Sequence, residues 1–466
     1  MPNPCRLALF SLLAAALAGC TVGPDYHRPA VAVPPRYAET GPWQPGAARL
    51  AEDGRWWEIF RDPALDALEA RVQISNQTLK AAEAQYRQAL ALAQQARAGL
   101  YPTLGANASL SRSASSSAVG VVKSGSIVNN VAGSLQASWA PDVWGRIRRQ
   151  VEAGEASAEA SAADLAGARL SLQAQLAQAY FSLRLADAQR QLLESTAAAY
   201  RQILHITRNQ YAGGIASQAN VAQAEAQYKS AAAQAVDAGI ARAQYLHAIA
   251  VLIGVPASNF RLAAAANWQA ALPPIPPGLP SQLLQRRPDI AASERQMAAA
   301  NAQIGVAEAA WYPNFTLSAN GGLQAATLAQ WIDAPARFWS LGPALAQTLF
   351  DGGLRRAQTA AAKAAYAAAE ANYRQTVLGA FQQVEDNLSA LDILAKEAAL
   401  QGEALASART AYDLTLNQYR AGVVGYLNVL SAQTSLLGNE KSVLALAGQR
   451  QAASVALIQA LGGRWD

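Results

Sequence analysis

The stretch NQYAGGIASQANV at residues 209–221 returns 208 residues later as NQYRAGVVGYLNV at residues 417–429. The same displacement relates Gly254 to Gly462. A period this long lies far outside the roughly 20 to 50 residues of solenoid repeats, so it favours two duplicated half-domains. Most of the chain is therefore expected to be two copies of one unit.

The two copies set the expected domain boundaries. We expect the first copy over residues 65–254 and the second over residues 286–462. Between them, residues 255–285 form a linker that the run LPPIPPGLP makes stiff. An extended leader over residues 20–64 and a short tail over residues 463–466 complete the chain.

The N-terminus has the features of a secretory signal over residues 1–19. Leu7 to Ala18 is an apolar run too short for the ~20 residues of a spanning helix. The run ends in Leu-Ala-Gly-Cys, which resembles a bacterial lipobox with Cys20 as the lipidated residue. That resemblance implies a diacylglycerol and an N-palmitoyl group on Cys20. By resemblance to Gram-negative sorting rules, Thr21 rather than Asp in the next position favours the outer membrane. An ordinary signal with a chance cysteine is the alternative.

Composition argues against several functional classes. After loss of the signal, which contains Arg6 and no acid, the chain retains 36 basic and 32 acidic residues, and it has no long basic block, so nucleic-acid binding is disfavoured. His27, His205 and His247 are too scattered for a metal site. The sequence shows no nucleophile with an adjacent general base, no paired carboxylates and no phosphate-binding loop. We therefore expect neither an enzyme nor a cofactor beyond the lipid.

Each copy contains two segments in which apolar and polar residues alternate. These segments predict one β-hairpin at about 103–140 and a second at about 314–349, each with one apolar face and one polar face. Strands of about ten residues suit a tilted transmembrane strand. A soluble hairpin with one buried face is the alternative, but aromatic residues at the strand ends resemble the interfacial girdle of outer-membrane barrels. They are Trp139, Trp144, Trp311, Tyr312, Phe315 and Trp339.

Four strands do not close a barrel, and an open sheet edge cannot exist in lipid. The chain is therefore expected to oligomerise. Two copies would supply eight strands and an interior filled by side chains, whereas three copies would supply twelve strands and a true lumen.

The remaining sequence reads as helix. Gly145 to Tyr211 and Gly353 to Tyr419 are nearly uninterrupted, and about 67 helical residues span roughly 100 Å. Leu65 to Leu100 and Asn220 to Ile253 predict two shorter helices that match this span when placed end to end. Asp142 precedes the first long helix and Asp351 precedes the second. We expect each carboxylate to cap the first amide groups of the helix that follows it.

Taken together, these features resemble the TolC-type outer-membrane efflux family, in the lipoprotein branch that serves drug-efflux pumps. The resemblance covers the mature chain and rests on the order and spacing of several short motifs. They are Trp56-Trp57, Asp62-Pro63, Arg286-Arg287-Pro288-Asp289-Ile290, Tyr312-Pro313, Leu349-Phe350-Asp351-Gly352-Gly353, and Tyr426-Leu427.

The resemblance implies a mixed α+β membrane protein. Three subunits would form a twelve-stranded β-barrel continuous with a twelve-helix periplasmic α-barrel. The homotrimer would be a passive exit duct for drugs or other small molecules. Its partners would be a periplasmic adaptor, an inner-membrane pump of the RND type and outer-membrane lipid.

The resemblance also implies roles for the two helical tips. The tips would dock on the adaptor, through Gly213 and Gly214 in the first copy and Gly422 and Val423 in the second. Glycine at these three positions permits the helix-ending conformations that close such turns, and a well-formed turn without a docking role is the alternative. The second tip would narrow the tunnel into a gate without the acidic residues that many relatives place there. We expect neutral hydrogen bonds and apolar contacts to hold it closed, through Tyr419, Arg420, Leu427, Asn428 and Ser431.

Other readings remain open at this point. Within the duct class, the alternative cargo is a polypeptide, as in type I secretion. A periplasmic coiled-coil adaptor would share the lipid anchor and helical hairpins but should lack the duplicated strands. A lipid-anchored scaffold without a pore would need no polar strand face.

Overall fold

The computed structural model describes residues 21–39, 54–114, 127–265, 268, 272–275 and 280–463. The signal sequence and Cys20 lie outside these residues. The chain divides into two compact units, each described by itself. The first unit draws on Met1–Ala30, Gln85–Ala162 and Ala292–Arg374, and the second on Val31–Ala84, Ala163–Ala291 and Gln375–Asp466.

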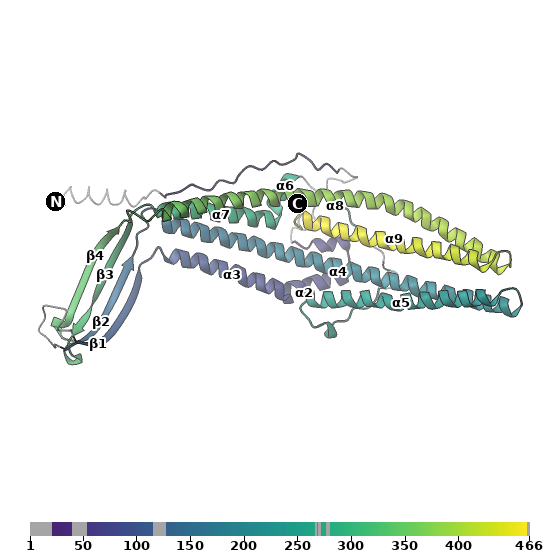
Figure 1. The fold of residues 1–466 in the computed structure, drawn as a ribbon, viewed down its shortest axis with the longest axis horizontal. Coiled ribbons are helices and arrows are strands. Elements are labelled where there is room, and N and C mark those ends of the chain that lie inside the picture. The colour runs from purple at the N-terminus through teal and green to yellow at the C-terminus, as the bar shows by residue number, and fades with distance from the viewer. Residues whose placement is uncertain are drawn as a thin grey trace. The chain divides into compact units, whose positions relative to one another are not determined.

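The first unit contains one antiparallel sheet in the order β1-β2-β3-β4 (Figure 1). The strands are β1 (Thr103–Ala114), β2 (Ile127–Trp139), β3 (Asn314–Ala325) and β4 (Arg337–Ala346), with two 3₁₀ turns, η3 (Leu328–Gln330) and η4 (Ala334–Ala336), between the last two. These strands occupy the segments in which alternation predicted them. The hairpins of the two copies join through β2 and β3, which leaves β1 and β4 as the sheet edges.

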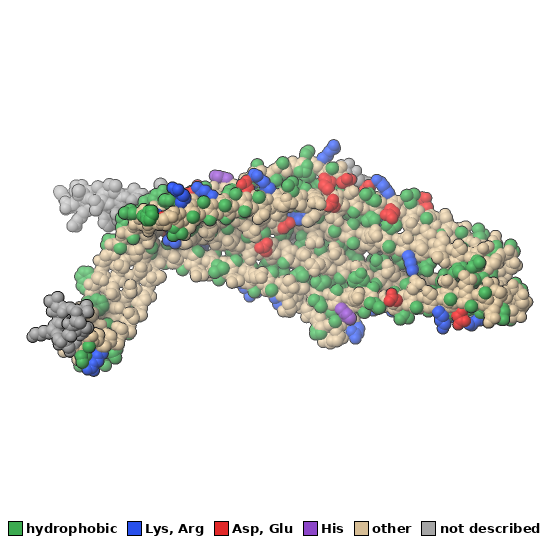
Figure 2. Space-filling model, viewed as in Figure 1, with side chains coloured by type: hydrophobic (Ala, Val, Ile, Leu, Met, Phe, Trp, Pro, Cys, Tyr) green, Lys and Arg blue, Asp and Glu red, His purple; other side chains and the backbone are tan. Residues whose placement is uncertain are grey.

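The strand register gathers apolar residues on one face of the sheet. Leu104 lies opposite Ala137, and Leu110 lies opposite Val131. On the other face, Asn107 lies opposite Ser134. Because facing residues in an antiparallel pair point to the same side, the predicted division into an apolar and a polar face is confirmed. Leu104 and Leu110 are largely exposed, and Figure 2 shows few charged side chains over the strands. The chain by itself leaves its apolar face uncovered.

Two helices of 67 residues dominate the remaining chain. They are α4 (Arg146–Ala212) and α8 (Leu354–Arg420), each followed by a 35-residue helix, α5 (Gln218–Leu252) or α9 (Tyr426–Ala460). The shorter elements are η1 (Trp56–Phe60), α2 (Pro63–Ser75), α3 (Gln77–Ala98), η2 (Ala257–Asn259), α6 (Pro280–Arg286) and α7 (Pro288–Ala309). None of the helices within the described ranges is both long and apolar enough to cross a membrane.

The single helix predicted over Leu65 to Leu100 is wrong, because the backbone leaves helical geometry at Asn76 (φ −65°, ψ 124°). The Asn76 Oδ1 accepts a hydrogen bond from the Leu79 amide at 2.9 Å, which caps α3. Its Nδ2 donates to the Leu252 carbonyl at 2.7 Å. At Gly254, where φ is +69°, a Cβ would overlap the Ser75 carbonyl. The end of α5 therefore meets the junction between α2 and α3.

The core of the second unit is aromatic near the start of α2. Trp56 and Phe60 pack edge to face, and Phe60 contacts Phe181 at 4.9 Å between ring centroids. The Tyr180 hydroxyl donates to Asp62 at 2.6 Å, and Asp62 also caps α2. The strong N-terminal cap and the aromatic cluster together fix α2 against α4.

A buried carboxylate joins α4 to α5. Asp187 accepts from the Arg242 Nε at 2.6 Å and lies 3.5 Å from the Arg184 guanidinium. Both arginines also donate to backbone carbonyls, of Leu262 and Ala263 respectively. This triad ties the segment after η2 to the long helix.

The caps expected before the long helices are confirmed. Asp142 accepts from the amides of Ile147 and Arg148, each at 2.8 Å. Asp351 accepts from the Gly353 amide at 3.0 Å, and the nearby Arg355 guanidinium lowers the pKa of Asp351. Each carboxylate thus neutralises the partial positive charge of a helix N-terminus.

Candidate functional site

Two turns of equivalent sequence join the helices of the second unit, α4 to α5 and α8 to α9. Gly214 and Gly422 occupy the left-handed region with φ of +75° and +76°, which a side chain would disfavour. Gly213 lies outside this region of backbone conformation. Ile215 and Val423 stand at matching positions and are 75% and 72% exposed. Each turn therefore presents an apolar side chain at its tip.

Beneath the turns, one small core links the two hairpins. We call it the tip cluster, and its buried members are Ile203, Leu204, Ala224, Tyr419, Tyr426 and Val429. The rings of Tyr419 and Tyr426 lie 6.3 Å apart between centroids. Since the cluster draws on both copies, the first hairpin packs directly against the second.

A buried hydrogen bond between Thr207 and Tyr419 crosses between the hairpins. The hydroxyls of Thr207 and Tyr419 lie 2.9 Å apart, and Thr207 also donates to the Ile203 carbonyl. The Gln210 side chain donates to the Tyr419 carbonyl at 3.4 Å. Burial raises the pKa of Tyr426 to about 12, so its hydroxyl stays neutral at physiological pH. These contacts between the hairpins carry no formal charge.

The structure places the five residues expected at the gate in two different environments. Tyr419 is 3% exposed and bonds to Thr207 inside the cluster. The other four are exposed, namely Arg420, Leu427, Asn428 and Ser431. Of these five residues, only Tyr419 belongs to the buried tip cluster.

Sequence reasoning missed Thr207 and Tyr426 as parts of this site. Tyr426 replaces Gln218 of the first copy, and an aromatic residue at a position that is polar in its duplicate is a signal that could have found it. Thr207 gives no such signal, because its counterpart Thr415 is also a threonine.

A second feature of interest lies in the first unit, where the strands end. Trp144 and Tyr312 stack at 4.8 Å, and the Val22 amide donates to the Trp144 carbonyl. Arg149 is buried and binds the leader through the carbonyls of Val22 and Gly23 and the carboxylate of Asp25. The residues just after Cys20 are therefore fixed beside an aromatic pair.

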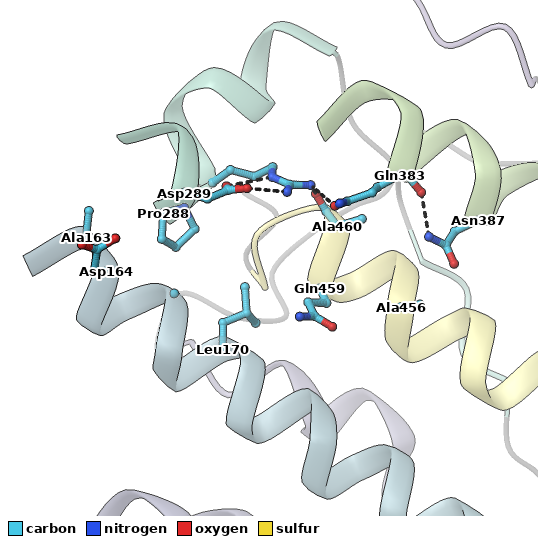
Figure 3. Close-up of a pocket in the computed structure, with 12 residues that line it drawn as sticks. Ala163, Asp164, Leu170, Pro288, Asp289, Gln383, Asn387, Ala456, Gln459 and Ala460 are labelled. Carbon is cyan, nitrogen blue, oxygen red and sulfur yellow. Dashed lines mark hydrogen bonds and ion pairs between the residues drawn. The ribbon is translucent and has the colours of Figure 1, made fainter. Parts of the chain in front are cut away.

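The second unit also contains a polar groove around Arg287 (Figure 3). This buried guanidinium donates to both carboxylate oxygens of Asp289, to Gln383 at 2.9 Å and to the Ala460 carbonyl at 3.0 Å. It thereby joins the start of α7 to the end of α9, as Asn76 joins α3 to α5. In the part of the chain that the structure covers, no group of three or more His, Cys, Asp or Glu residues is placed to hold a metal ion.

Comparison with known proteins identifies the family. A family model described as outer membrane efflux protein matches residues 68–255 and 279–463. The pyoverdine export outer membrane protein OpmQ of Pseudomonas aeruginosa is 31% identical, over 90% of this chain and 90% of its own length. The outer membrane protein OprJ of the same organism is 30% identical, over 98% and 95% respectively.

Among solved structures, the outer-membrane channel OprN superposes with a TM-score of 0.88 at 30% identity, covering 96% of this chain and 100% of that one. The similarity thus spans the sheet, the long helices and the tip turns. This chain belongs to the outer membrane efflux protein family, as the outer-membrane channel component of an efflux system that extends into the periplasm.

Proposed function

We propose that three copies of this chain form a passive exit duct, with a twelve-stranded barrel in the outer membrane and a tunnel of twelve helices in the periplasm. The observation that carries the proposal is the open amphipathic sheet. Strands β1 and β4 are edges, and the apolar face of the sheet is uncovered. Lipid would cover that face, and neighbouring subunits would pair the edges.

The cargo of this duct would be drugs or other small molecules, delivered by an inner-membrane pump of the RND type through a periplasmic adaptor. The names of relatives support small-molecule export, since that of OpmQ specifies pyoverdine. The exposed Ile215 and Val423 at the tips suit an adaptor that covers apolar side chains. Gly213, Gly214 and Gly422 complete this docking surface.

The closed state of the duct would be maintained at the tips. Within each subunit the bond between Thr207 and Tyr419 holds the second hairpin against the first. The exposed Arg420, Leu427, Asn428 and Ser431 would narrow the tunnel between subunits. Opening would then separate α8 from α4 at the tip and break a buried neutral contact.

A lipid on Cys20 would add a second membrane attachment. Support comes from the leader, because Arg149 fixes Val22 and Asp25 beside the stacked Trp144 and Tyr312. Aromatic pairs of this kind suit the interface between lipid and water. The acyl chains would then start at the level where the barrel ends.

A pair of adjacent substitutions tests the barrel. Leu110→Arg puts a charge on the apolar face, at a cost of about 2 to 4 kcal/mol if that face meets the bilayer centre. Ser109→Arg puts the same charge on the polar face. We expect the first variant to lose heat-resistant trimers in outer-membrane fractions, and the second to keep its trimers and conduct less in a planar bilayer. Equal trimer yields from both variants would contradict the assignment of the faces.

Deletion of the gene tests the cargo. We expect the deletion strain to become more sensitive to a panel of toxic small molecules, and a wild-type copy to restore resistance. Unchanged sensitivity together with loss of a secreted polypeptide would favour the type I secretion alternative.

A further inference from the structure

The four strands contain two charged residues within their bounds, and both are arginines. Arg112 lies near the end of β1, and Arg337 begins β4. Strands β2 and β3 contain no charged residue. Both arginines are exposed, and neither side chain makes a hydrogen bond or ion pair with any residue that the structure describes, including Asp333 in the connection between β3 and β4. Charge in the sheet is therefore confined to its first and last strands.

The strand register places both arginines on the apolar face of the sheet. Arg112 follows Leu110 by two residues, so the two side chains share a face. This face continues from β1 to β4 through four paired positions, Leu104, Ala137, Ala319 and Leu341. Arg337 precedes Leu341 by four residues on β4, so it lies on the same face.

Both arginines also lie at the same end of the sheet. Strand β1 follows α3 and β4 leads back to α8, so Arg112 and Arg337 lie at the end away from these helices (Figure 1). Along β4 the apolar face reads Leu341, Trp339 and Arg337 towards that end. The order of apolar, aromatic and basic residues matches the hydrocarbon core, the interface and the headgroups of a bilayer. At its other end this face of β4 carries the uncharged Leu345.

The connection between β3 and β4 folds back over the same face. The Trp331 indole lies against Gly133, where a side chain would overlap the ring, and it donates to the Leu323 carbonyl at 3.2 Å. Gly133 and Leu323 are paired positions of the apolar face, so the ring covers part of that face. Leu328 and Ile332 in this connection are largely exposed. Hydrophobic and basic side chains accordingly lie together at this end of the sheet (Figure 2).

We propose that Arg112 and Arg337 bind the phosphate groups of lipids in the outer leaflet of the outer membrane. The proposal rests on the proposed duct, because helices in the periplasm put the opposite end of the sheet at the outer leaflet. An arginine on the lipid face is costly at the bilayer centre and costs little near the interface. There its guanidinium donates charge-assisted hydrogen bonds to lipid phosphates, while Trp339 meets the acyl chains.

A second copy of the chain would complete each site. Strands β1 and β4 are the edges of the sheet, so closure of the barrel would pair β1 of one subunit with β4 of the next. Each boundary between subunits would then present Arg112 and Arg337 on two adjacent strands of the lipid face. Two guanidiniums attract one phosphate more strongly than either does alone. We therefore expect three sites in a trimer.

Native mass spectrometry of the purified full-length protein in detergent tests the proposal. The probe is lipid A, a glycolipid with two phosphates, and the reference is the same lipid after enzymatic removal of its phosphates. We expect up to three phosphorylated lipids per trimer, bound more tightly than the reference. Arg112→Gln and Arg337→Gln should each weaken binding by about fivefold, and the double variant by roughly 25-fold.

The matched control is Arg356→Gln. Arg356 is an exposed arginine in the first turn of α8, at the other end of the sheet, and its side chain also makes no ion pair with a described residue. The control removes the same charge and should leave lipid affinity unchanged. Equal wild-type affinity for the two lipids, or an equal loss in Arg356→Gln, would overturn the proposal.

Trimer yield and planar-bilayer conductance of the same samples separate this proposal from that of the duct. A wild-type protein that forms conducting trimers but does not prefer the phosphorylated lipid would refute the lipid site alone. A wild-type protein that forms no trimers would refute the duct and the lipid site together.

Discussion

Removal of a single hydroxyl at the tip should shift the duct towards its open state. Tyr419→Phe deletes the buried bond to Thr207 and keeps the ring that packs in the tip cluster. Thr207 still donates to the Ile203 carbonyl, so no donor is left without a partner. The loss is therefore that of one neutral hydrogen bond, about 1 kcal/mol per subunit.

In the proposed trimer the three bonds would break together on opening. Their sum of about 3 kcal/mol corresponds to a roughly 150-fold change in the ratio of closed to open states. Single-channel recording in planar bilayers measures this ratio directly. Thr207→Val removes the same bond but leaves the buried Tyr419 hydroxyl without an acceptor, so the double variant should have the closed-to-open ratio of Tyr419→Phe alone.

The control for this prediction is Tyr228→Phe. It deletes a tyrosine hydroxyl that accepts from Arg201 inside the first hairpin. This change should leave the closed-to-open ratio as in the wild type. An unchanged ratio in both Tyr419→Phe and Thr207→Val, or an equal shift in the control, would refute the reasoning.

Three further substitutions have defined outcomes. Asp187→Ala leaves two arginines without their shared carboxylate and should lower the free energy of unfolding by about 3 to 5 kcal/mol, as measured by denaturant titration. The control Asp413→Ala, at an exposed position, should leave this free energy nearly unchanged. Burial raises the pKa of Glu69 well above its usual value, so the folded state holds a proton that the unfolded state releases, and stability falls as pH rises from about 4.5 towards the folded pKa. The melting temperature of Glu69→Gln should not decrease over this pH range and should exceed that of the wild type at high pH. Gly214→Ala should destabilise the tip by about 1 kcal/mol, because Gly214 has a positive φ, whereas Gly213→Ala should be tolerated. Hydrogen exchange of the tip amides should therefore be faster in Gly214→Ala and unchanged in Gly213→Ala.

The features that sequence predicted well are those whose signal is local. Leu104 and Leu110 share a face because strand geometry repeats every two residues, and their partners follow once the hairpin forms. The long helices end at glycines such as Gly214, which act within one turn of the chain. Such signals need no knowledge of distant residues.

The features that sequence missed depend on partners far along the chain. No proline or glycine marks the break at Asn76, whose only local signal is an N-cap residue type, and the break is also stabilised by the Leu252 carbonyl, 176 residues away. Tyr419 was expected at a gate, but its hydroxyl partner Thr207 is separated by 212 residues and lies on another helix. Only the packing of elements that are distant in the sequence brings these groups together.

The break at Asn76 makes the two helices of the first hairpin mechanically different. Helix α4 is one continuous rod of 67 residues, so a displacement at its tip must be absorbed by gentle curvature along its length. Helix α5 instead stops at a joint, where side-chain hydrogen bonds from Ser75 and Asn76 hold its end in place of continuous helical backbone. A force applied at the tip would therefore reach the end of α5 as strain on these hydrogen bonds, whereas in α4 the helical backbone itself carries it.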